Sequence, residues 1–404
     1  MIPESFITKE EELIKHTNAT LLPDEKGLLA KLLYNADKEK RQLRIKLGID
    51  PTSTDLHLGH TVSLQLLKKF QELGHLPVLI IGGFTATVGD PSGRNETRPP
   101  LTYKEVKENA KTYLNQVGKI LDVKKTEILD NYKWLSKLSF SELIKLAHLV
   151  TVNQLIAKEA FGTRISAGDP LYLHETLYPL LQAYDSVMVK SDIEIGGVDQ
   201  TYNILFGRHV QKHYGQKEQL AILLPLLIGL DGKRKMSKSF NNYIALNDSP
   251  EEIYGKAMSI PDDLILHYFK LVTNTDIKEL TGYENELKKG KNPRDIKMIL
   301  AKKLVSQFYS STSGEEAESN FIKQFKLKEI PDIIPEFVLE KPLKVIDLIF
   351  LAKLTQSKAE AKRLIEGGGV KLKSNKVHDP NTMITENDKS SVLQIGKRKF
   401  VRII

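Results

Sequence analysis

The chain has 404 residues, a net charge of +8 and an isoelectric point of about 9.1, and it contains no cysteine. The lack of cysteine excludes disulfide bonds and thiolate metal sites, and no apolar run approaches the roughly 18 residues that a membrane span requires. The N-terminus also lacks a basic segment followed by an apolar one, so we expect a cytoplasmic protein with no membrane partner. The length predicts two to four domains.

The first 81 residues predict the beginning of an α/β fold. Residues 1–40 are interpreted as helices, and residues 43–49 alternate apolar side chains with other types, which is the period of a strand. A helical spacing of apolar residues follows until Gly74, and residues 77–81 predict a second strand. Strand, helix and strand in this order predict a doubly wound parallel sheet with ligands at the carboxyl ends of its strands. The candidate core residues of the N-terminal helices are Leu13, Ile14, Leu28, Leu29, Leu32 and Leu33.

The turn at residues 50–60, between the first predicted strand and the helix after it, contains two histidines. His57 and His60 lie where the helix would begin, in the sequence His-Leu-Gly-His. Backbone N–H groups at a helix N-terminus are unpaired and the helix dipole is positive there, so this position favours an anion such as phosphate. Gly59 lets a ligand approach the backbone, and the two histidines add hydrogen-bond donors.

The segment from residue 82 to residue 160 supplies a second loop and a helical stretch. Residues 82–93 form a Gly-rich loop that follows the second strand and contains one acid, Asp90. Residues 103–160 are predicted to be mostly helical and amphipathic, and this surface packs either as core or as a dimer face. Core packing explains Trp134, the single tryptophan of the chain.

Polar residues then gather on one predicted helix and at the end of the next strand. On a helix, Tyr178, Gln182 and Asp185 share one face because they are spaced at i, i+4 and i+7. An acid, an amide and a phenol are costly to bury without partners, so this stripe contacts either a polar ligand or solvent. Residues 193–197 predict a strand, and Asp199 and Gln200 follow it.

The C-terminal half begins with a Gly- and Lys-rich loop at residues 229–239, which contains the sequence Lys-Met-Ser-Lys-Ser from Lys235 onward. Helix-start signals at Ser249 and Asn292 predict a helical region, and three prolines mark a linker after it. Residues 341–404 hold 14 Lys and Arg against 6 Asp and Glu, whereas the other 340 residues hold 45 of each sign. A basic end on a neutral body is typical of a contact with nucleic acid.

The motifs together resemble a known family. His-Leu-Gly-His and Lys-Met-Ser-Lys-Ser, in this order on one chain, are similar to the signatures of class I aminoacyl-tRNA synthetases. Tyr-x-x-x-Gln-x-x-Asp followed by Gly-Gly-x-Asp-Gln, with Gly-Asp-Pro-Ser-Gly upstream, resembles the tyrosyl-tRNA synthetases over nearly the whole chain. The resemblance implies a Rossmann-like catalytic domain at residues 1–242, a helical anticodon-region domain at 243–328, a linker at 329–342 and a small basic α+β RNA-binding domain at 343–404.

The same resemblance implies roles for individual residues. The catalytic residues would be His57, His60, Lys235 and Lys238. ATP would be bound by these four together with Thr52, Gly59, Met236 and Ser237. Tyrosine would be bound by Asp50, Asp90, Tyr178, Gln182, Asp185 and Gln200. The ribose of the adenylate would be bound by Gly197 and Asp199, and tRNA by Lys358, Lys362 and Arg363.

The sequence departs from many bacterial members at Lys46. In those members a tyrosine stands four residues before the first aspartate of the turn and contacts the phenol of the substrate, whereas this chain resembles a second subgroup with Lys-x-Gly-x-Asp. Lys46 therefore either contributes to the substrate pocket or points at Asp185, at another acid or at solvent.

The resemblance further implies ATP as a magnesium complex, L-tyrosine and tRNA(Tyr) as substrates, no tightly bound cofactor and no protein-held metal, and a homodimer. Three other functions remain open at this point. Tryptophanyl-tRNA synthetases share the fold and both signatures, a nucleotidyltransferase can carry an H-x-G-H turn, and an RNA-binding or splicing factor can descend from a synthetase.

Overall fold

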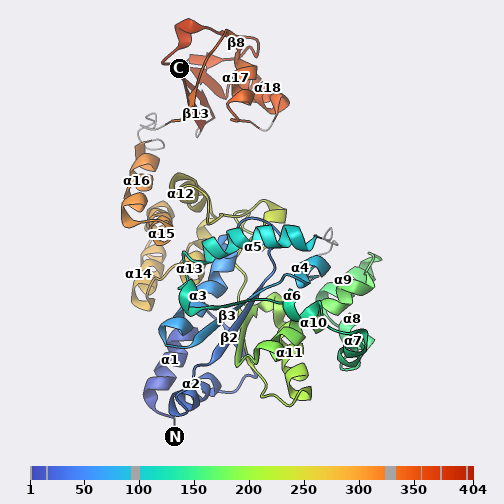
Figure 1. Cartoon of the computed structure of the whole chain (residues 1–404). Coiled ribbons are helices and arrows are strands. Elements are labelled where there is room, and N and C mark those ends of the chain that lie inside the picture. Colours follow the sequence, from blue (N-terminus) through green and yellow to red (C-terminus); the bar gives the residue numbers. More distant parts are fainter. Residues whose placement is uncertain are drawn as a thin grey trace. The chain divides into compact units, whose positions relative to one another are not determined.

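The computed structural model describes residues 2–14, 17–91, 101–323, 334–355, 357–373, 375–396 and 399–404. The chain divides into two compact units, one ending at Ser311 and the other beginning at Thr312 (Figure 1). The predicted Ser92 and Gly93 of the Gly-rich loop, and part of the predicted linker, lie outside the described residues. The first unit contains every predicted tyrosine- and ATP-binding residue.

The first unit is built on a six-stranded sheet with the strand order β1-β6-β5-β2-β3-β4. All neighbouring strands are parallel except β1, which pairs antiparallel with β6 at one edge. The chain runs outward from β2 through β3 to β4 and then returns to β5 on the other side of β2, so the strand order reverses between β2 and β5. This confirms the predicted doubly wound fold. The strands are β1 Thr20–Leu22, β2 Arg44–Ile49, β3 Leu76–Ile81, β4 Glu127–Asp130, β5 Ile193–Gly197 and β6 Leu220–Leu224.

Helices pack on both faces of this sheet, with α3 on one side and α11 on the other (Figure 1). Right-handed crossovers that run in opposite directions from β2 and β5 must place their helices on opposite faces. The helices up to β6 are α1 Glu4–Ile14, α2 Leu28–Lys38, α3 Leu58–Glu72, α4 Thr85–Val88, α5 Tyr103–Val117, α6 Tyr132–Leu135, α7 Phe140–Ala147, α8 Val152–Ile156, α9 Glu159–Ala167, α10 Leu173–Val189 and α11 Thr201–His213.

Two predictions of secondary structure were incomplete, and both concern edge strands. Residues 1–40 contain β1 as well as helices, and residues 103–160 contain β4. Neither strand has a fully buried side chain, so neither shows the clean alternation that reveals a strand in sequence. Of the predicted core residues in this region, Leu13, Leu29, Leu32 and Leu33 are buried, whereas Ile14 and Leu28 are half-buried.

In the helical region after β6, two helices begin at the positions that the sequence predicted. Ser249 caps α12 in a capping box with Glu252, and Asn292 caps α15, and each of these helices has proline at its first position. The division into two units keeps residues 243–311 with the catalytic sheet and places the residues from 312 onward in the second unit, so the boundary at residue 243 stays a prediction. The helices are α12 Pro250–Met258, α13 Ile265–Val272, α14 Ile277–Lys288, α15 Pro293–Phe308 and α16 Ser311–Ile322.

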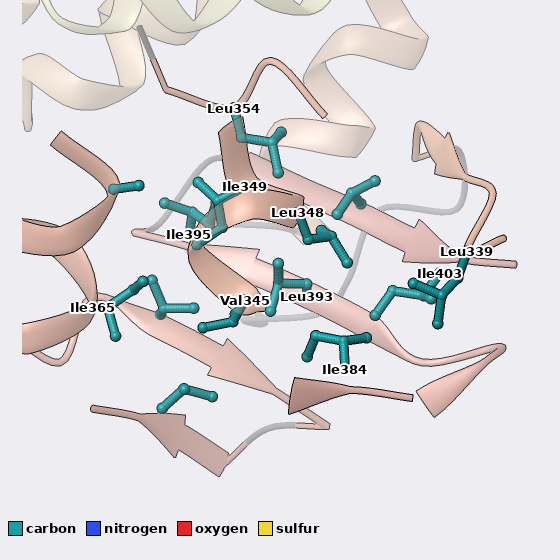
Figure 2. Close-up of a cluster of buried hydrophobic side chains, with 14 residues drawn as sticks. Leu339, Val345, Leu348, Ile349, Leu354, Ile365, Ile384, Leu393, Ile395 and Ile403 are labelled. Carbon is teal, nitrogen blue, oxygen red and sulfur yellow. The ribbon is translucent and has the colours of Figure 1, made fainter. Parts of the chain in front are cut away.

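The second unit carries a small α+β fold with its own core. Five strands in the order β10-β9-β12-β13-β7 form one sheet, and β8 pairs with β11. Figure 2 shows its buried apolar side chains, among them Leu348, Ile365 and Leu393, gathered between the helices and strands. The elements are β7 Glu336–Phe337, β8 Leu343–Lys344, α17 Val345–Leu351, α18 Lys358–Glu366, β9 Val370–Leu372, β10 Asn375–Val377, β11 Met383–Ile384, β12 Val392–Ile395 and β13 Lys399–Ile403.

Within the described parts of the chain, none of the helices combines the length and the apolar character that crossing a membrane requires.

Candidate active site

A cavity of about 560 Å³ opens in the first unit, where the carboxyl ends of β2 and β5 meet the N-terminus of α3. This is the point at which the strand order reverses, and doubly wound sheets bind ligands there because the loops after the two strands diverge. Every residue that the sequence predicted for tyrosine, ATP or the adenylate lines this cavity: Lys46, Asp50, Thr52, His57, Gly59, His60, Asp90, Tyr178, Gln182, Asp185, Gly197, Asp199, Gln200, Lys235, Met236, Ser237 and Lys238.

The two histidines form the N-terminal cap of α3. The Nδ1 atom of His57 accepts a hydrogen bond from the backbone N–H of Gly59 at 3.2 Å, and the backbone N–H of His57 donates to Nδ1 of His60 at 3.2 Å. This is a capping box in which both side chains are imidazoles. A Cβ atom at position 59 would lie 3.0 Å from the His57 ring, so glycine suits the close approach.

The caps determine which ring nitrogen of each histidine carries the proton. A nitrogen that accepts a hydrogen bond has no proton of its own, so both rings must be protonated at Nε2. Burial, followed by the charges of His60, Lys238 and Lys235, lowers the pKa of His57 well below 6.5. His57 is therefore a neutral donor that presents Nε2–H at the cavity near neutral pH.

The lysine loop is anchored to the cavity by its two lysines. The ammonium of Lys235 pairs with Asp199 at 2.7 Å, and that of Lys238 donates to Ser53 Oγ at 2.7 Å. The side chain of Asn242 accepts a hydrogen bond from the backbone N–H of Ser237 at 2.8 Å and so fixes the backbone of the loop. The two cations thereby line the same cavity as the α3 N-terminus, and together these groups could bind a polyphosphate.

A carboxylate and a phenol meet at the end of β2. Asp50 accepts from the Tyr178 hydroxyl at 2.9 Å and from Thr85 Oγ1 at 2.8 Å. A Cβ atom at Gly82 would lie 1.8 Å from the Asp50 carboxylate, so this turn requires glycine. Burial, together with Asp50 and Asp90, raises the pKa of Tyr178 well above 10, which keeps the hydroxyl protonated.

Asp185 lines the cavity and is 3% exposed. Its Oδ1 accepts from the indole N–H of Trp134 at 2.8 Å, and its Oδ2 accepts from Asn131 Nδ2 at 3.0 Å. Burial raises the pKa of Asp185 to about 6, although Lys46, Asn131 and Trp134 act to lower it. Trp134 packs beside the apolar core as predicted, and in addition it orients Asp185, which the sequence interpretation missed.

Lys46 points at an acid other than Asp185. Its ammonium contacts Glu194 Oε1 at 2.9 Å, Ser186 Oγ at 2.7 Å and the carbonyl oxygen of Gln182 at 3.0 Å. An ammonium has three N–H donors, and these three partners use them all. Lys46 and Glu194 are directly opposite each other in the parallel pair β2 and β5. Matching a lysine and a glutamate on two buried strands was the one sequence signal that could have revealed this pair.

Among the residues that the structure describes, no group of three or more His, Asp or Glu side chains could hold a metal ion. The cavity combines two cations, two histidine donors and several carboxylates, a set that suits a nucleotide and an amino acid in one cavity.

The sequence of the chain matches two family models. A model described as tRNA synthetases class I (W and Y) matches residues 38–326, and one described as the tyrosine–tRNA ligase SYY-like C-terminal domain matches residues 324–403. A tyrosine–tRNA ligase of Carboxydothermus hydrogenoformans is 45% identical and covers 100% of this chain and 99% of its own. A tyrosine–tRNA ligase of Thermotoga maritima is 47% identical and covers 98% of both.

Solved structures share the fold. The C-terminally truncated mitochondrial tyrosyl-tRNA synthetase of Aspergillus nidulans gives a TM-score of 0.65 at 21% identity, covering 80% of this chain and 99% of that one. The tyrosyl-tRNA synthetase of Archaeoglobus fulgidus complexed with L-tyrosine gives 0.60 at 24% identity, covering 77% and 99%. The tryptophanyl-tRNA synthetase of Plasmodium falciparum gives 0.57 at 18% identity, covering 79% and 89%.

Proposed function

The chain belongs to the tyrosine–tRNA ligases of the class I synthetases, and on this premise we propose which of its residues perform each step. The enzyme activates L-tyrosine with ATP and transfers tyrosine to the 3′ end of tRNA(Tyr). In the first step a carboxylate oxygen of tyrosine bonds to the α-phosphorus, and the bond to pyrophosphate breaks. Because that carboxylate is already ionised, no general base is needed, and the rate depends on positioning and on stabilising phosphate charge.

Tyrosine binds at the α10 side of the cavity. Asp185 accepts a hydrogen bond from the phenolic hydroxyl, and Tyr178, Gln182 and Asp90 receive the ammonium. Asp50 and Gln200 complete the pocket. This assignment is supported by the lining of the cavity and by the buried carboxylate of Asp185.

ATP binds between the cap of α3 and the lysine loop. His57 and His60 donate hydrogen bonds to the phosphates, and Lys235 and Lys238 neutralise the phosphate charge. When ATP binds, Lys235 leaves Asp199, and Asp199 and Gly197 then bind the ribose. Magnesium enters with the phosphates as part of the substrate. Thr52, Gly59, Met236 and Ser237 line the same cavity and are assigned to ATP as well.

The single observation that carries these roles is that one cavity collects both signature motifs and the Tyr178, Gln182 and Asp185 stripe. Exchange of labelled pyrophosphate into ATP, run with each amino acid in turn, tests it. We expect exchange with tyrosine alone. Exchange with tryptophan would indicate a tryptophanyl enzyme. Exchange in the absence of any amino acid would indicate a nucleotidyltransferase, and a complete lack of exchange would indicate an RNA-binding protein descended from a synthetase.

We predict an acid limb in the pH dependence of tyrosine activation. The phenolic hydroxyl donates to ionised Asp185, whose pKa is raised to about 6 mainly by burial. As the pH falls through this value, the carboxyl gains a proton and loses acceptor strength, so kcat/KM for tyrosine should fall about tenfold per pH unit well below it. Steady-state exchange between pH 5 and pH 8 measures this limb, and its persistence in Asp185→Asn would contradict the assignment.

We also propose that the enzyme is cytoplasmic and that it forms a homodimer. The dimer was suggested by the amphipathic stretch at residues 103–160. Helices α7 to α10 expose large apolar side chains: Phe140 is 78%, Val152 68% and Leu173 78% exposed. Exposed apolar surface of this kind marks an interaction site, and most oligomers of one chain are two-fold dimers. Sedimentation at micromolar concentration is expected to show twice the mass of the 45.7 kDa chain, and Phe140→Glu with Leu173→Glu should yield monomers. A wild-type protein that sediments at 45.7 kDa would contradict the dimer.

The second unit is proposed to bind tRNA through the exposed basic side chains of α18. Deleting residues 341–404 removes the net positive charge of the chain, so transfer to tRNA should weaken while adenylate formation persists. Replacing Lys358, Lys362 and Arg363 by alanine should flatten the slope of log affinity against log salt by about 2 to 3 units, because each phosphate contact releases counterions. Filter binding over a salt series measures the slope, and an unchanged slope would reject the assignment.

A further inference from the structure

Two buried polar residues, Lys158 and Asn203, lie behind the proposed tyrosine pocket. Lys158 is the residue before α9 and is 5% exposed, and Asn203 is on the first turn of α11 and is 1% exposed. Neither side chain lines the cavity. A buried ammonium is costly unless an acceptor compensates it, so the position of Lys158 requires an explanation other than contact with a ligand.

The ammonium of Lys158 starts a chain of hydrogen bonds that ends at the pocket. Its Nζ donates to Asn203 Oδ1 at 3.0 Å and lies 5.1 Å from the centre of the Phe161 ring. Asn203 Nδ2 in turn donates to Gln182 Oε1 at 2.9 Å and to Gln200 Oε1 at 2.8 Å. Both glutamines line the cavity.

Each glutamine passes the same polarity on to a carboxylate. Gln182 Nε2 donates to Glu194 Oε1 at 3.2 Å, and Gln200 Nε2 donates to Asp90 Oδ2 at 2.8 Å. Each of the three amides in this series of hydrogen bonds, Asn203, Gln182 and Gln200, therefore accepts through its oxygen on the Lys158 side and donates through its nitrogen on the carboxylate side.

Lys158 is the member that can impose this direction. An ammonium has only donors, whereas an amide can turn either end toward a neighbour. If Asn203 flipped, its NH2 group would face the ammonium, donor against donor, and its oxygen would draw the NH2 groups of both glutamines toward itself. The oxygens of the glutamines would then face the carboxylates of Glu194 and Asp90, acceptor against acceptor, and Asp90, which we propose to receive the substrate ammonium, would lose the donor that orients it.

We propose that Lys158 is a positioning residue for the amino-acid site: through Asn203 it keeps the Nε2 groups of Gln182 and Gln200 directed at Glu194 and Asp90, so that Asp90 is oriented to receive the substrate ammonium. This inference rests on the proposed binding of tyrosine in the cavity. It assigns Lys158 no contact with substrate, and it predicts that the residue acts on one end of the tyrosine molecule only.

Two fragments of tyrosine separate the two ends. Tyramine has the phenol and the ammonium, and 3-(4-hydroxyphenyl)propionate has the phenol and the carboxylate. In Lys158→Met we expect the inhibition constant of tyramine in the exchange assay to rise about tenfold, the effect of misdirecting a hydrogen bond to a charged group. The constant of the propionate should change less than twofold, and KM for tyrosine should rise while KM for ATP stays constant.

The ratio of the two inhibition constants is independent of the folded fraction, so it remains informative if the variant is less stable. Lys158→Gln provides the matched control, because its amide retains a donor for Asn203 and should restore part of the tyramine affinity. Equal losses for both fragments would overturn the inference in favour of a structural role, and a larger loss for the propionate would show that Lys158 attracts the carboxylate. A wild-type protein that exchanges pyrophosphate without tyrosine would refute the proposed function instead.

Discussion

Replacing His57 by alanine is expected to slow the formation of tyrosyl-adenylate by about 10²-fold or more, the usual effect of losing one donor to transition-state charge. The ring is neutral, because burial and nearby cations lower its pKa well below 6.5, and its Nδ1 is occupied by the Gly59 N–H. The remaining Nε2–H is thus fixed in orientation before ATP arrives. His60→Ala should have a similar effect, whereas tyrosine affinity should hardly change in either variant.

The variant His57→Asn separates catalysis from capping. Asparagine is among the best N-cap residues, so it should preserve the start of α3 and the melting temperature, yet its shorter side chain does not reach as far as Nε2. Single-turnover measurements of adenylate formation should therefore show nearly the same loss as His57→Ala. A variant that binds tyrosine poorly but reacts at the wild-type rate would disprove the role of the histidine.

Asp185→Ala is expected to lower the preference for tyrosine over phenylalanine in activation by about 10²-fold, because the wild-type pocket penalises phenylalanine through an unpaired buried carboxylate. Asn131 and Trp134 already donate to this carboxylate and fix its orientation, so it cannot turn away when the phenolic hydroxyl is absent. Steady-state exchange with both amino acids measures the ratio.

Lys46→Met is the control for this prediction. Lys46 is 1% exposed and its three donors are directed at Glu194, Ser186 and the Gln182 carbonyl, so removing its charge should reduce stability and tyrosine affinity more than selectivity. Asp185→Asn, which keeps the volume of the side chain, should lose part of the preference. If Lys46→Met erased the preference while Asp185→Ala kept it, the phenol would be recognised by the lysine.

The residues that the sequence identified share a local origin. His57 and His60 act within one helical turn, and Tyr178, Gln182 and Asp185 share a face because a helix repeats every 3.6 residues. Such relations depend only on the neighbouring chain. The parallel sheet and its reversal of strand order then bring the two groups and the lysine loop to one edge, as the βαβ pattern predicted.

Long-range partners could not be predicted in the same way. Trp134 was interpreted from its apolar character, yet its indole N–H contacts an acid 51 residues away, and Lys158 reaches Asn203 across 45 residues. The edge strands β1 and β4 were missed because neither buries a face completely. The sequence by itself determined the motifs, the strand and helix that carry each one, and the class of reaction. Only the tertiary structure decided which polar side chains meet in the interior, because that depends on the packing of helices and strands from distant parts of the chain.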